Sequence, residues 1–204
     1  MSMKKSDSRN QILNVAEEHF SAKGFDGARV KEIARDAKVN KALIYYYFES
    51  KEDILDALFE KLILDARNII NEYEIDDYSD EEALLEIIDE MLDFLESKDT
   101  ILRVAFAESL KRRKYHSIVI EIGYILIGKE IEAIITEYKK LGTDFSKDSE
   151  QMIVTEFFTG IIPMLNYIVF RKDFGDYFEI EEAALRERFI RAFKNTHLAY
   201  HKNR

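Results

Sequence analysis

Three consecutive tyrosines, Tyr45, Tyr46 and Tyr47, together with Lys41 and Lys51, are the side chains of this sequence best suited to holding an anion. Phenols and ammonium groups donate hydrogen bonds to phosphate oxygens, and such contacts supply much of the affinity of proteins for DNA. Successive residues of an α-helix point about 100° apart, so the three rings cannot all be buried. Taken alone, such tyrosines more often belong to a core or an interface. The surrounding sequence is therefore needed to distinguish these roles from contact with an anion.

Short helices must position these groups. Apolar residues at helical spacing predict three of them, over residues 8–23, 30–37 and 41–48. Gly24 would end the first with a positive φ, and Asn40 would cap the third. The second helix would turn the small residues Ala34 and Ala37 inward. A short helix pair with a tight turn is what a helix-turn-helix needs, because its second helix enters the major groove.

The rest of the chain is also predicted to be helical. Ser50 caps a long fourth helix, and Gly160 and Pro163 mark a kink in a later one. The expected fold class is all-α, with an N-terminal three-helix helix-turn-helix domain, a C-terminal helical bundle and about nine helices in total. We expect a DNA-binding domain over residues 1–50 and a ligand-sensing and dimerisation domain over residues 51–204, bridged by the fourth helix.

Charge is distributed unevenly along the chain. Residues 1–51 carry ten Lys and Arg against seven Asp and Glu, a net charge of +3, although the whole chain has a net charge of -10. The remainder therefore carries -13. A polyanion would be attracted to the first part and repelled by the second. The chain has no cysteine, which excludes disulfides and thiolate metal sites and favours a cytoplasmic location.

The stretches ILNVAEEHFSAKGF and VKEIARDAKVNKALIYYYFESKEDIL, and the spacing of Ile44, Tyr45, Phe48 and Lys51, resemble the TetR family of bacterial transcriptional regulators over about the first quarter of the chain. The resemblance implies a homodimer on a palindromic double-stranded DNA operator, released by a small-molecule effector. It implies groove contacts from Lys41, Ala42 and Tyr46 and phosphate contacts from Tyr45, Tyr47, Lys51 and the start of the second helix. The full DNA-binding set is Arg29, Val30, Lys31, Asn40, Lys41, Ala42, Tyr45, Tyr46, Tyr47 and Lys51.

Two positions depart from the family pattern. The family often has glycine in the turn where this chain has Lys38, so that residue must accept a strained backbone or the turn must differ. The family often has histidine where this chain has Tyr47. Both differences bear on which DNA sequence is bound.

The last helices carry more apolar surface than one core needs, which favours a four-helix dimer seam. The predicted interface consists of Phe158, Ile161, Ile162, Leu165, Ile168, Val169, Leu185, Phe189, Ile190 and Phe193. A pocket for a small apolar or aromatic effector could be lined by Phe106, Glu121, Tyr124, Phe157, Met164 and Tyr167, although such residues are more often ordinary core. Glu121 lies in an apolar stretch over 118–128 that predicts a buried helix, and an ion pair or simple exposure is the alternative to a ligand contact.

Other functions find little support. The chain has no glycine-rich phosphate loop and no nucleophile or metalloprotease motif, so we expect no enzymatic activity and no cofactor. His197 and His201 share a helical face without a third ligand, so no metal site is expected. The longest uncharged run, residues 157–170, is shorter than the roughly 20 residues of a membrane span, so we expect a buried helix and no membrane partner. The alternative to an effector-controlled regulator is a DNA-bound adaptor controlled by a protein partner.

Overall fold

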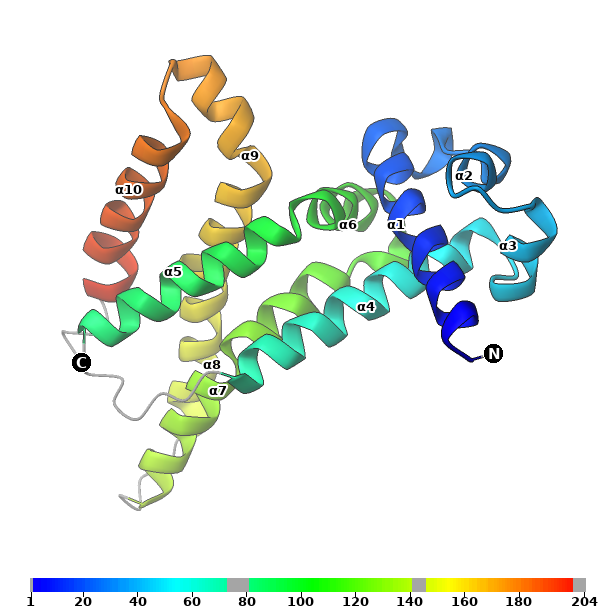
Figure 1. The fold of residues 1–204 in the computed structure, drawn as a ribbon. Helices are drawn as coiled ribbons and strands as arrows, with labels where there is room; N and C mark the ends of the chain where they lie inside the picture. Colours follow the sequence, from blue (N-terminus) through cyan, green and yellow to red (C-terminus); the bar gives the residue numbers. More distant parts are fainter. Residues whose placement is uncertain (1, 73–80, 141–145, 200–204) are drawn as a thin grey trace. The chain divides into compact units, whose positions relative to one another are not determined.

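The computed structural model describes residues 2–72, 81–140 and 146–199, and all regular elements in these ranges are helices (Figure 1). The chain divides into two compact units. Unit 1 comprises Met1–Asp65 and Thr100–Val119, and unit 2 comprises Ala66–Asp99 and Ile120–Arg204. The predicted all-α class is confirmed, with nine continuous helices in the described ranges because two of the ten α-helical segments are joined through a π turn.

Unit 1 contains the helices predicted from the first fifty residues. They are α1 (Ser2–Gly27), α2 (Val30–Asp36) and α3 (Lys41–Tyr47), followed by most of α4 (Lys51–Glu72). The unit also takes in most of α6 (Asp99–Lys111) and the 3₁₀ turn η1 (Arg113–Tyr115). Segments distant in the sequence thus share one body with the helix-turn-helix, an arrangement that no local pattern indicates.

Unit 2 contains the remaining helices. They are α5 (Glu81–Ser97), most of α7 (Ile118–Lys140), α8 (Ser146–Thr155), α9 (Ile162–Phe178) and α10 (Glu182–Phe193), with π turns η2 (Glu156–Ile161) and η3 (Lys194–Leu198). Figure 1 shows α9 and α10 as an antiparallel pair joined at their top by a tight connection. The boundary between the units falls inside α4, α6 and α7.

The core of the helix-turn-helix forms where α1, α2 and α3 pack on one another. Ile12, Phe20, Ile33, Ile44 and Phe48 are buried there, each at 2% exposure or less. Ala34 and Ala37 are buried as predicted, and their small side chains let the helices approach closely. Gly24 has the expected positive φ of 69° and a non-helical ψ of 163°, so the regular helix ends there as predicted and resumes beyond a kink up to Gly27.

The predicted kink in the later helix is present as a π turn. Pro163 lies in the first turn of α9, directly after η2. Proline has no backbone N–H to donate and its ring crowds the preceding turn, so a wider turn accommodates it. Gly160 lies within this turn, where a Cβ atom would stand 2.9 Å from Nε2 of His197. The glycine is therefore required by the close approach of η3.

The expectation that the start of α7 is buried all round is wrong. Ile122, Leu126 and Ile127 are buried, but Ile120 and Tyr124 are exposed. Glu121 is also exposed and lies 3.6 Å from the guanidinium of Arg67. The stretch was judged by its total apolar content, whereas the helix buries only one stripe of it.

Most of the residues predicted for the dimer interface are already packed within a single chain. Ile161, Leu165, Ile168, Val169, Leu185 and Phe193 are buried in unit 2, and Ile162, Phe189 and Ile190 are half-buried. Phe158 is the one member of the predicted set that is exposed. Within one chain α9 packs beside α5 and α10, and the predicted dimer interface stays a prediction. The large side chains of α9 that do face outward are Phe170, Phe174, Tyr177 and Phe178.

One helix among the described residues, Glu150–Phe178, is long and apolar enough to cross a membrane by length and composition. Half of its most apolar window is buried inside the structure, and core helices of water-soluble proteins meet the same criteria. The predicted absence of a membrane partner therefore stays a prediction.

Two glycines of unit 2 should respond oppositely to substitution. At Gly175 a Cβ atom would stand 2.9 Å from the carbonyl oxygen of Ile180, whereas at Gly128 nothing lies within 4 Å. We expect Gly175→Ala to lower the free energy of unfolding by about 1–3 kcal/mol, because a backbone atom must move. Gly128→Ala should raise it by about 0.5–1 kcal/mol through lower chain entropy in the unfolded state. Urea denaturation measures both, and equal effects would contradict this packing.

Candidate DNA-contact surface

The turn between α2 and α3 is built around a strained residue. Lys38 has a φ of 54°, in the left-handed region that glycine adopts more easily. The sequence allowed either a strained backbone or a different turn, and the structure shows the strained backbone. The turn is held by the backbone N–H of Val39, which donates to the carbonyl of Ala34 at 2.9 Å.

Asn40 begins α3 as its N-cap, as predicted. Its side-chain oxygen accepts a hydrogen bond from the backbone N–H of Leu43 at 2.7 Å. On the inner face, Ile44 and Phe48 are buried, which fixes how the helix rotates about its axis. The opposite face is therefore held toward solvent.

The tyrosines of α3 divide between these faces. Tyr45 is 48% exposed and Tyr46 is 61% exposed, while Tyr47 is half-buried and packs edge-on against Tyr46 with ring centroids 5.1 Å apart. The ammonium of Lys41 lies over the ring of Tyr45, 5.3 Å from its centroid. The helix thus presents two phenols and a cation on one outward surface.

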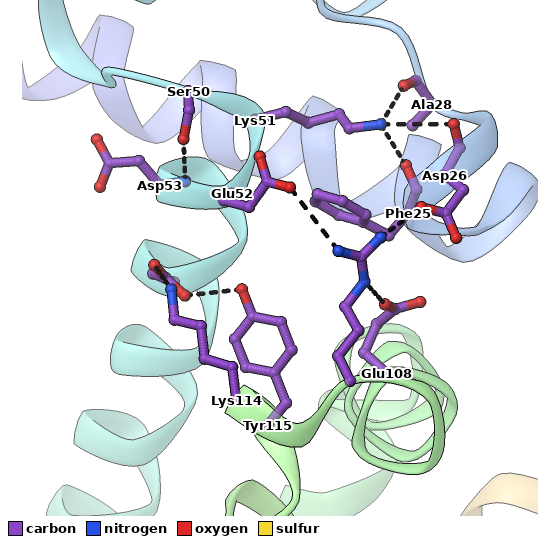
Figure 2. A network of polar contacts seen from close by, with 12 residues as sticks. Phe25, Asp26, Ala28, Ser50, Lys51, Glu52, Asp53, Glu108, Lys114 and Tyr115 are labelled. Atoms are coloured by element: carbon purple, nitrogen blue, oxygen red, sulfur yellow. Dashed lines mark hydrogen bonds and ion pairs between the residues drawn. The ribbon is translucent and has the colours of Figure 1, made fainter.

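The side chain of Lys51 extends to the end of α1 (Figure 2). Its Nζ donates to the backbone carbonyls of Phe25 at 2.7 Å, Ala28 at 3.0 Å and Asp26 at 3.4 Å, and lies 4.3 Å from the centroid of the Phe25 ring. Carbonyls at the C-terminal end of a helix lack partners within the helix and attract cations. The ammonium therefore joins the start of α4 to the end of α1. The predicted phosphate contact of Lys51 stays a prediction, and this geometry favours a clamping role.

The start of α4 is fixed by a pair of reciprocal hydrogen bonds. The hydroxyl of Ser50 accepts from the backbone N–H of Asp53 at 3.1 Å, and the carboxylate of Asp53 accepts from the N–H of Glu49 at 2.9 Å. This arrangement satisfies N–H groups before and inside the first turn, as in a capping box. Lys51, the first residue of α4, therefore extends from a helix end that these hydrogen bonds hold in place.

A second polar link holds α1 against α2. Nε2 of His19 lies 2.9 Å from Oδ2 of Asp36, and the guanidinium of Arg35 also contacts that carboxylate. Hydrogen bonds from Arg35 and His19 lower the pKa of Asp36 to about 2. Asp36 therefore stays ionised at neutral pH, and its charge supports the helix pair beneath the turn.

All ten residues predicted to bind DNA lie at the surface of unit 1 or partly below it. Arg29, Lys31, Asn40, Lys41, Ala42, Tyr45 and Tyr46 are exposed, and Val30, Tyr47 and Lys51 are half-buried. The start of α2 and the outer face of α3 belong to the same compact unit. The chemistry available there is hydrogen-bond donation to anionic oxygens and edge contact from two aromatic rings.

The residues predicted to line an effector pocket are divided between the two units and differ in burial, and the pocket stays a prediction. Phe106 belongs to unit 1 and is half-buried, whereas Glu121 and Tyr124 are exposed in unit 2. Phe157 is half-buried, and Met164 and Tyr167 are buried in unit 2. A surface hollow of about 540 Å³, lined by Arg171, Lys172, Gly175, Asp176, Glu179, Ile180, Glu181 and Glu182, contains none of the predicted residues.

No group of His, Cys, Asp and Glu suited to a metal occurs in the described part of the chain, and His201 lies outside it.

Comparison with known proteins bears on the first quarter of the chain. Residues 12–58 match the family model of bacterial regulatory proteins of the tetR family. This range runs from the first core residue of α1 to the second turn of α4. The predicted resemblance is confirmed over these residues, which are similar to the N-terminal region of tetR-family regulators.

Named relatives agree with that assignment. The chain is 30% identical over 102 residues to the HTH-type transcriptional repressor NicS of Pseudomonas putida, covering 50% of this chain and 48% of NicS. It is 39% identical over 66 residues to the HTH-type transcriptional regulator HbdR of an Aromatoleum strain, covering 32% of this chain and 26% of HbdR. The matched stretch thus spans at most about half the length of these curated relatives.

Solved structures show that the fold likeness extends along the whole chain. A tetR-family transcriptional regulator from Streptomyces coelicolor superposes with a TM-score of 0.62 at 17% identity, over 96% of this chain and 83% of that one. A transcriptional regulator from Aquifex aeolicus gives a TM-score of 0.60 at 19% identity, over 92% and 98%. The likeness in fold therefore extends over more than nine tenths of the chain.

The strained turn provides a stability test. Replacing Lys38 by glycine should raise the free energy of unfolding by up to about 1 kcal/mol, because glycine adopts a positive φ without the Cβ clash. Lys38→Ala removes the same charge and long side chain but keeps Cβ, so it should bring no gain. Thermal or urea unfolding compares the two variants. A gain in Lys38→Ala equal to that in Lys38→Gly would show that backbone strain is not the cause.

Proposed function

We propose that this protein is a sequence-specific DNA-binding transcriptional regulator, acting in the cytoplasm as a homodimeric repressor. The observation that carries the proposal is the outward face of α3, where Tyr45, Tyr46 and Lys41 are exposed on a helix whose inner face is locked by Ile44 and Phe48. A short rigid helix of this kind fits the major groove. The N-terminal match to the tetR family supports the same function.

Within this function, the side chains divide into two roles. Tyr46, Lys41 and Ala42 lie toward the start and outer face of α3, from which they would meet base edges. Tyr45, Tyr47 and the residues that begin α2, Arg29, Val30 and Lys31, would contact phosphates on either side of the groove. Asn40 would contribute through its position at the exposed N-terminus of α3.

Dimerisation is proposed because one recognition helix reads only half of a palindromic operator. Exposed aromatic residues of α9 support a contact between copies. Phe174 and Phe178 lie with ring centroids 4.6 Å apart, and Tyr177 packs edge-on against Phe178 at 4.9 Å. Phe170 is exposed on the same helix. Apolar side chains gathered at a surface favour burial against another molecule, and a second copy is the partner that the fold class suggests.

A small apolar or aromatic effector is proposed to control DNA binding. Tyr167 supports this, because its ring is buried and stacked on Phe189 at 4.4 Å, while its hydroxyl has no hydrogen-bond partner among the described residues. Burial raises the pKa of Tyr167, so the hydroxyl stays protonated. A buried hydroxyl without a partner costs free energy, which a polar group on a ligand would recover. Phe157 and Met164 lie in the same unit.

Selection of duplexes from fragmented genomic DNA, with the full chain, tests the DNA-binding proposal. We expect the selected duplexes to share an inverted repeat, as two recognition helices require. Tyr46→Ala should reduce discrimination between this sequence and random DNA by about tenfold, since a lost base contact costs 1–3 kcal/mol. The matched control is Leu64→Ala, which removes an exposed apolar side chain of α4 elsewhere in unit 1. Wild-type discrimination in Tyr46→Ala would contradict the groove assignment.

Tyr167→Phe tests the effector proposal. Removing the unpaired hydroxyl should leave the free energy of unfolding unchanged or raise it by at most about 1 kcal/mol. Thermal-shift screening of the wild type with a panel of aromatic and apolar metabolites should find compounds that stabilise it, and these should lose most of their effect in Tyr167→Phe. A panel without any stabilising compound would contradict the small-molecule proposal and favour the protein-partner alternative.

A further inference from the structure

Arg112, directly after α6, makes polar contacts with residues of three helices. Figure 2 labels its partners Asp26, Glu52 and Glu108. Its Nε donates to Oε2 of Glu108 at 2.8 Å, and its Nη2 donates to the carboxylate of Asp26 at the end of α1. Its Nη1 lies 3.8 Å from Oε1 of Glu52 in the first turn of α4. One guanidinium therefore faces carboxylates from α1, α4 and α6.

Burial makes this network costly to break. Glu108 is 1% exposed, with Arg112 in hydrogen-bond contact at 2.8 Å and Lys111 in a longer ion pair at 3.8 Å. A buried carboxylate that loses its partner carries the full cost of desolvation. The guanidinium carbon also lies 4.4 Å from the centroid of the buried Phe25 ring, the same ring that Lys51 approaches. Arg112 and the clamp of Lys51 thus act on the same end of α1.

A second contact fixes η1 to α4 one turn further along. The hydroxyl of Tyr115 donates to Oδ1 of Asp56 at 2.9 Å, and the ammonium of Lys114 pairs with the other oxygen of that carboxylate. The ring of Tyr115 packs edge-on against Phe59 at 5.1 Å. Burial and the bond to Asp56 raise the pKa of Tyr115, so it remains a neutral donor. Residues 108–115 therefore contact two successive turns of α4, which fixes both the position of that helix and the direction of its axis within unit 1.

From this geometry we propose that Arg112 is a positioning residue for DNA binding, and this inference rests on the function proposed above. Arg112 sets the angle between the end of α1 and the start of α4, and thereby the orientation of α2 and α3. Residues 100–119 are bounded on both sides by segments of unit 2. Arg112 is thus the residue through which segment 100–119 contacts the helices of the DNA-binding region.

A direct contact of Arg112 with DNA would change the salt dependence of binding in a different way. All three nitrogens of its guanidinium face carboxylates of the same unit, so Arg112 is not placed to neutralise a phosphate. A lost phosphate contact lowers the slope of log affinity against log salt concentration by about 1. Loss of a positioning residue weakens binding and leaves that slope unchanged. Salt dependence therefore separates the two roles.

The test measures affinity of the full chain for a duplex that the wild type selects, at several salt concentrations. We expect Arg112→Gln to bind at least about tenfold more weakly, because recognition tolerates only small displacements, with an unchanged salt slope. Arg112→Lys keeps the positive charge but lacks the planar guanidinium with its several donors, so it should recover part of the loss. The matched control is Arg113→Gln, which removes an equal charge from the exposed neighbouring residue and should stay within about twofold of the wild type.

Urea unfolding and hydrogen exchange of the same variants complete the test. Arg112→Gln should remain folded at the assay temperature, with faster exchange confined to residues 24–28 and 51–56. If Arg112→Gln does not fold, Glu52→Gln breaks the longest of the three contacts and should reproduce the loss of affinity in milder form. Wild-type affinity in both variants, a salt slope lower by about 1, or a loss equal to the unfolded fraction would each overturn the proposal. Failure of the wild type to select any duplex would instead refute the proposed function.

Discussion

The end of α1 is the constraint on which the N-terminal unit depends. Its last carbonyls have no partners within the helix, and the ammonium of Lys51, from the start of α4, satisfies those of Phe25 and Asp26 and that of Ala28 just beyond the helix. Because Ser50 and Asp53 cap α4 at the same place, the lysine is delivered from a fixed helix end. The orientation of α2 and α3 follows from this contact between the end of α1 and the start of α4, since both helices pack against α1.

Much of this unit is predictable from sequence, because its determinants are local. Gly24, Asn40 and Ser50 each act through residues within four positions, so their roles can be derived from types and spacing. The strain at Lys38 was also visible, as one of two outcomes for a turn that lacks glycine. The exposure of Tyr45 and Tyr46 follows from helical geometry once Ile44 and Phe48 are assigned to the core.

Other features depend on contacts between distant segments and leave no local pattern. Arg112 meets Asp26 across 86 residues, and nothing in its neighbourhood distinguishes it from Arg113. Composition does not separate core from surface in the C-terminal unit. Leu165 and Ile168 are predicted for a dimer seam because α9 is broadly apolar, and both are buried within a single chain, where α9 packs against α5 and α10. The outward aromatic residues, such as Phe174 and Tyr177, could be separated from them only by the actual packing.

The central claim is that the outer face of α3 lies against a duplex. Hydroxyl-radical footprinting of the full chain, read by mass spectrometry, measures this directly because exposed tyrosine rings are oxidised readily. Adding a duplex that the protein binds should protect Tyr45 and Tyr46 and leave the oxidation of the exposed Tyr177 unchanged. Unaltered oxidation of Tyr45 and Tyr46 in the bound state would show that DNA is held by another surface.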